Sequence, residues 1–142
     1  MKKCLDLSLI YAIAGMAGGV FYREFTKWNG YTGVTALGKV HVHLLLLGTV
    51  MFLLAALFAK VSPLENERLY RPFLVTYNVG VPLTAVMMLA RGVLEVRGTP
   101  LSAALNASVS GIAGLAHILT GTGLVLFLLA LRKAADKAAR SV

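Results

Sequence analysis

The sequence has little charge and almost no cysteine. Only 14% of the 142 residues are charged, whereas about 25% are charged in a typical soluble domain. The single cysteine, Cys4, excludes a disulfide scaffold, and without a Cys-x-x-Cys-His motif covalent c-type haem is excluded too. The shortage of polar residues also excludes low-complexity disorder.

Apolar residues fill the chain instead. They make up 58% of it, and the mean hydropathy is +0.77. A soluble domain of this length could not bury so much apolar surface. Spanning about 30 Å of hydrocarbon takes roughly 20 helical residues. Residues 1–142 are therefore predicted to form one all-α domain in the lipid bilayer, with four transmembrane helices at about 5–21, 37–59, 73–90 and 107–131.

The positive charges predict an orientation. With both termini inside, nine lysines and arginines lie in the cytoplasm and five lie outside, as the positive-inside rule favours. The formal charge of +8 then reflects orientation and attraction to anionic lipid. No soluble module with a basic face exists, so no nucleic-acid partner is expected.

All three histidines fall inside predicted spans, where ionisable side chains are costly. His41 and His43 are two residues apart, about 200° around a regular helix. They cannot share one small ion, so the helix serves two separate sites. Imidazole is an axial ligand of haem iron. The alternative is that each histidine only hydrogen-bonds a neighbouring helix, for about 0.6 kcal/mol.

His117 lies among glycines in the fourth span. Gly114 and Gly121 stand three residues before it and four after it, on its face of the helix. Such a face either lets another helix approach closely or leaves room for a flat macrocycle. Asn78 and Pro82 in the third span are interpreted as a kink with a satisfied amide.

The segment from Gly38 to Gly48 resembles the His-x-His helix of haem–copper oxidase subunit I. Together with 18–27 and 113–117, it resembles more closely a family of small four-helix bacterial membrane proteins of unassigned function. The second resemblance covers most of the chain and implies a multi-pass protein of the bacterial plasma (inner) membrane.

The oxidase resemblance implies haem b, held without covalent bonds. In that family the two histidines ligate two different haems, on the second helix of a four-helix arc, and three arcs form a twelve-helix plan. A homotrimer of this chain would reproduce that plan. The resemblance also implies that Arg91 and Arg97 hold haem propionates, as guanidinium groups pair well with carboxylates. Two charges at the headgroup layer are the plainer interpretation.

One departure limits the resemblance. The third span, between Arg71 and Arg97, contains no histidine, so the copper-site ligands are missing. This argues against a terminal oxidase and leaves open whether the chain is an enzyme.

These observations lead to one hypothesis and two alternatives. In the hypothesis, His41 of one subunit and His43 of the next sandwich a b-type haem for electron transfer with a quinone or another redox partner. If one axial position is open and His117 lies distal to it, O2 or NO binding follows. The alternatives are a haem-free proton or ion channel or transporter with the histidines as a relay, supported by Thr49, Thr120 and Thr122, and an assembly partner of a respiratory complex.

Overall fold

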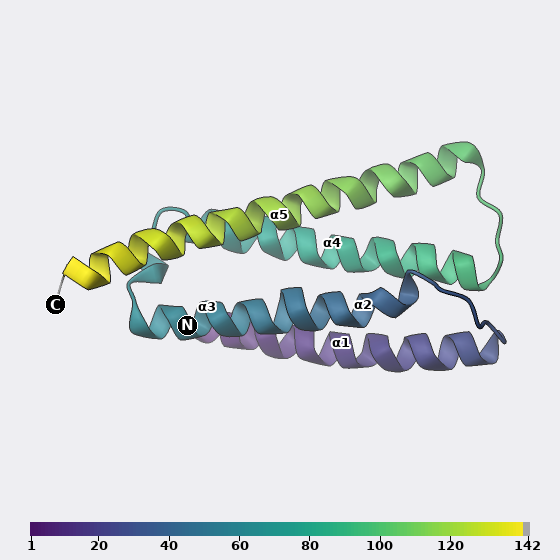
Figure 1. Cartoon of the computed structure of the whole chain (residues 1–142), viewed down its shortest axis with the longest axis horizontal. Coiled ribbons are helices and arrows are strands. Elements are labelled where there is room, and N and C mark those ends of the chain that lie inside the picture. The colour runs from purple at the N-terminus through teal and green to yellow at the C-terminus, as the bar shows by residue number, and fades with distance from the viewer. Residues whose placement is uncertain (141–142) are drawn as a thin grey trace.

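The computed structural model describes residues 1–140 and is all-helical in this range (Figure 1). The two chain ends lie at the same end of the molecule. The elements run in this order: α1 (Lys2–Trp28), α2 (Leu37–His43), η1 (Leu44–Val50), α3 (Met51–Val61), η2 (Leu64–Asn66), α4 (Tyr70–Val96) and α5 (Ala103–Arg140).

Four helical stretches are long and apolar enough to cross a membrane, as predicted. The second consists of α2, η1 and α3, which continue one another from Leu37 to Val61. The helices extend beyond the predicted spans. The predicted bounds follow the apolar residues, and a charged residue ends an apolar run without ending the helix. At 1.5 Å per residue, the 27 residues of α1 rise about 40 Å, more than the roughly 30 Å of hydrocarbon.

The helices form two packed pairs. One pair is α1 with the segment from α2 to α3, and the other is α4 with α5; α2 also packs on α4. Aromatic rings fill the core near the end that holds the chain termini. The Phe73 ring lies 4.9 Å from Phe127 and 5.5 Å from Tyr77, between ring centroids, and Phe52 lies 5.7 Å from Tyr77.

The second span changes its winding directly after His43. Residues Leu44–Val50 form a π-helix, a form that is rare and often marks functional sites. Gly48 faces the Tyr11 ring of α1 in this segment, and a Cβ added to it would lie 2.3 Å from that ring. His41 and His43 precede the change, so the 200° between them still holds.

The N-terminus of α2 is capped by a side chain from another helix. The Ala36 amide donates to Glu95 Oε2 at 2.7 Å, and the Thr35 hydroxyl donates to the same oxygen at 2.9 Å. Capping residues satisfy amides that a helix cannot pair itself. Glu95 belongs to α4, so this contact also fixes α2 against α4.

Glu95→Ala is therefore expected to lower the free energy of unfolding by about 1 kcal/mol, since the Ala36 amide loses its acceptor while the Thr35 hydroxyl keeps the Gly92 carbonyl at 3.2 Å. SDS titration in mixed micelles, followed by circular dichroism, measures this. Glu95→Gln keeps one oxygen acceptor and should recover part of the loss. Equal stability of Glu95→Ala and the parent chain would show that the cap contributes nothing.

Candidate functional site: three membrane histidines

His43 is anchored at one ring nitrogen and open at the other. Its Nδ1 lies 2.9 Å from the Lys39 carbonyl oxygen one turn earlier, so Nδ1 carries the proton and donates it. The ring borders a hollow of about 140 Å³ that Val42, Leu46 and Leu47 also line. This leaves Nε2 as a lone-pair donor in apolar surroundings.

His117 on α5 has the same local geometry. Its Nδ1 lies 2.7 Å from the Ala113 carbonyl oxygen, and the residue is exposed. A Cβ added at Gly114 or Gly121 would meet no atom of the chain within 4 Å. Close packing inside the chain is therefore not the reason for these glycines.

His41 is placed differently, against α1. Its ring stacks on Tyr22 with 6.3 Å between centroids and 14° between planes, and its Cβ would lie 3.6 Å from a Cβ added to Gly19. His41 Nδ1 is buried and has no hydrogen-bond partner within residues 1–140. The absence of a side chain at Gly19 thus lets the second span pack closely on α1. The Nδ1 atom of His41 remains without a hydrogen bond within residues 1–140.

The three histidines do not form one site within a chain. No group of three or more His, Cys, Asp or Glu side chains that could hold a metal ion occurs in the described residues. His41 faces α1 and His43 lines a separate hollow, while α5 packs chiefly along α4. A cofactor bound by two of them needs a second molecule to complete its site.

Two of the three rings have a local hydrogen bond that is common among metal-binding histidines. A histidine that binds a metal almost always donates its other ring N–H to a carbonyl or carboxylate, which fixes the tautomer and the ring. His43 and His117 both meet this condition. The hollow at His43 is smaller than the roughly 300 Å³ at which ligand pockets begin, so a macrocycle would extend over the helix surface.

The two arginines expected to hold propionates have different surroundings: Arg91 lies within α4, five residues before its end, and only Arg97 follows the helix. Arg91 Nη2 donates to Ser110 Oγ at 2.7 Å and to Asn106 Oδ1 at 3.4 Å. Arg97 follows the last residue of α4 and is exposed. The Arg97 side chain is thus exposed beyond the helix end, whereas the Arg91 guanidinium is already hydrogen-bonded to α5.

The hydroxyls of the relay hypothesis lie apart. Thr120 donates to the Ala116 carbonyl at 2.9 Å, and its oxygen lies 3.4 Å from Thr84 Oγ1, between α4 and α5. Within residues 1–140, Thr49 Oγ1 is buried on η1 and has no hydrogen-bond partner, and Thr122 is exposed. No hydrogen bond between described residues links any of these threonines to a histidine.

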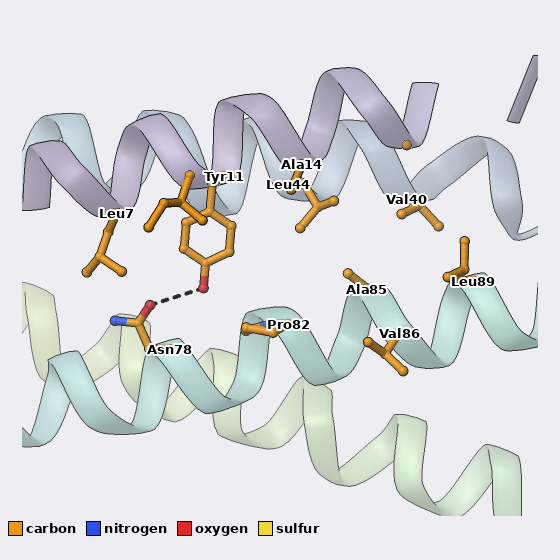
Figure 2. Close-up of a pocket in the computed structure, with 12 residues that line it drawn as sticks. Leu7, Tyr11, Ala14, Val40, Leu44, Asn78, Pro82, Ala85, Val86 and Leu89 are labelled. Atoms are coloured by element: carbon orange, nitrogen blue, oxygen red, sulfur yellow. Dashed lines mark hydrogen bonds between the residues drawn. The ribbon is translucent and has the colours of Figure 1, made fainter. Parts of the chain in front are cut away.

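An apolar groove between α1 and α4 was not anticipated from the sequence (Figure 2). Its volume is about 430 Å³, and Tyr11 of α1 meets Asn78 of α4 across it. The polar residue Asn78 in an apolar span was the available signal. Its partner could not be identified, because nothing in the sequence shows that Tyr11 faces α4.

Comparison with known proteins identifies a family but no activity. The model of a family described as "Protein of unknown function (DUF2871)" matches residues 1–134. No curated protein and no solved structure matches the chain.

Proposed function

We propose that this chain, which belongs to that family of unknown function, is a multi-pass membrane protein that binds haem b between subunits. The anchored ring of His43 supplies one axial ligand. The second comes from the neighbouring subunit, where His117 is anchored in the same way and His41 is the other candidate. Haem b held by two imidazoles transfers single electrons, and with one imidazole it leaves a position for O2 or NO.

One observation carries this proposal. The Nδ1 atoms of His43 and His117 are hydrogen-bonded to the carbonyls of Lys39 and Ala113, and both rings therefore present Nε2. An unpaired imidazole acceptor in hydrocarbon is costly. Coordination to iron would satisfy this nitrogen, and the Nδ1 hydrogen bond would hold the ring in one orientation.

The surfaces around these rings favour a site between subunits. The face of α5 at His117 is bare at Gly114 and Gly121, and the hollow at His43 is open and apolar. A flat macrocycle fits between two such surfaces. With His43 of α2 and His117 of α5 as the two ligands, each subunit presents two different faces, which is compatible with a closed ring of subunits; the homotrimer is the case that the oxidase resemblance suggests.

The proposed setting is the bacterial inner membrane with both termini in the cytoplasm. The distribution of nine against five positive residues supports this orientation. The two termini lie at one end of the molecule (Figure 1). There α5 ends with Arg132, Lys133 and Lys137, and Lys137 pairs with Glu67 at 2.6 Å.

Single variants distinguish the two candidates for the second ligand. In His117→Ala we expect the reduced haem to become five-coordinate and to bind CO with a shifted Soret band, while His41→Ala keeps the parent spectrum. The reverse pattern would assign the ligand to His41. If both variants keep the six-coordinate spectrum and the parent haem content, ligation by two histidines of this chain is wrong.

A further inference from the structure

The groove between α1 and α4 lies in the middle of the membrane-spanning region. Ala14 and Pro82 both line it, and each is one residue from the midpoint of its 27-residue helix. The volume of about 430 Å³ is within the roughly 300–1,000 Å³ of small-molecule sites. The groove is therefore a place for a molecule dissolved in the bilayer.

Two side chains place hydrogen-bonding groups in this apolar groove. The Tyr11 hydroxyl donates to Asn78 Oδ1 at 3.1 Å (Figure 2), and Asn78 Nδ2 donates to the Leu74 carbonyl at 2.9 Å. An amide NH2 has two hydrogens and a phenol oxygen also accepts. One Asn78 N–H and the acceptor capacity of Tyr11 thus remain unused within the described chain.

Pro82 adds a backbone acceptor on the same helix. In a regular α-helix the carbonyl of residue 78 accepts from the amide of residue 82, but proline has no N–H. α4 continues through Pro82, so the Asn78 carbonyl lacks this partner. Unsatisfied polar groups are costly in hydrocarbon. Asn78 of α4 thus offers a second amide N–H and a carbonyl that Pro82 cannot pair, with the Tyr11 hydroxyl of α1 at 3.1 Å from its Oδ1.

We infer that this groove binds a lipid-soluble ring compound of the quinone and quinol class. In the quinone form a ring carbonyl accepts from the Asn78 amide. In the quinol form a ring hydroxyl donates to Tyr11 or to the Asn78 carbonyl, and in both forms the isoprenoid tail continues along the apolar wall into the bilayer. An acyl chain has no group to pair with these atoms. Lipid ester and headgroup oxygens remain at the membrane surface, away from Pro82.

The test is a calorimetric titration in which decylubiquinone is added to the full chain in phosphatidylcholine nanodiscs. Decylbenzene, which has the same tail and no oxygen, is the control ligand. We expect saturable binding of the quinone only. Asn78→Leu removes the amide and should weaken binding about tenfold, and Ala14→Phe, at an exposed residue of the groove wall, should abolish it.

Ile13→Phe is the matched control, because Ile13 is 56% exposed on α1 and does not line the groove; it should bind like the parent chain. Equal binding of decylbenzene would overturn the inference in favour of an acyl-chain site. Quinone binding that survives Ala14→Phe, or no saturable binding at all, would also overturn it. A third result would overturn it as well: the parent chain does not bind quinone, and Ala14→Phe forms a smaller oligomer than the parent. The groove would then be filled by a second copy of the chain.

The groove contains none of the three histidines. Failure of quinone binding therefore leaves the haem proposal intact, and loss of haem in a histidine variant leaves the groove intact.

Discussion

His43→Ala is expected to lose its haem. The variant removes the one imidazole that is both anchored through Nδ1 and set in an apolar hollow. Mutation of a residue that only hydrogen-bonds a metal ligand lowers the metal affinity roughly 10–100-fold. Removal of the ligand itself should therefore lower the haem affinity by at least that factor. The haem content per chain after purification, from the pyridine haemochrome, measures the effect.

Two controls make this result specific. Val42→Ala alters the same hollow without removing a ligand and should keep the haem. In His43→Gly, added imidazole should restore the Soret band, because the free base can occupy the vacated position. A His43→Ala protein that keeps one haem per chain would contradict the assignment of His43.

Gly92→Ala is expected to disrupt the contact between α2 and α4. A Cβ at residue 92 would lie 2.3 Å from the Leu37 nitrogen and 2.8 Å from its Cα, and backbone atoms cannot move aside as a side chain can. Overpacking typically costs about 1–3 kcal/mol, and this contact also holds the capped N-terminus of α2. SDS titration in mixed micelles should show the loss.

Gly114→Ala is the matched control. It adds the same methyl group to an α5 position where no atom lies within 4 Å, and alanine favours a helix interior over glycine by about 1 kcal/mol. The detergent-solubilised chain should therefore be slightly stabilised. Equal stability of Gly92→Ala and the parent would show that α2 and α4 do not approach as closely as described.

The sequence was sufficient for the membrane helices, because hydropathy over 20 residues depends on composition and not on partners. It was insufficient for the winding of Leu44–Val50. Within the π-helix Gly48 packs closely on the Tyr11 ring of α1, a tertiary contact that local sequence patterns do not report. For the same reason, the capping of α2 by Glu95, about 60 residues away, could not be found from local capping patterns.

The histidines were identifiable as candidates but their roles were not. Their position in apolar spans is a sequence property, and their cost in a membrane follows from it. Whether a ring donates to the carbonyl four residues earlier cannot be read from the sequence, because that carbonyl is equally near every helical histidine. His43 and His117 use that carbonyl, while His41 stacks on Tyr22.

Haem b binding is tested by a reduced-minus-oxidised absorption spectrum of the purified protein, with a haem count per chain. The chain should be expressed with ample haem. We expect a b-type spectrum and about one haem per chain. A colourless protein without a Soret band under these conditions would contradict it, and proton or ion flux in vesicles would then be the property to measure.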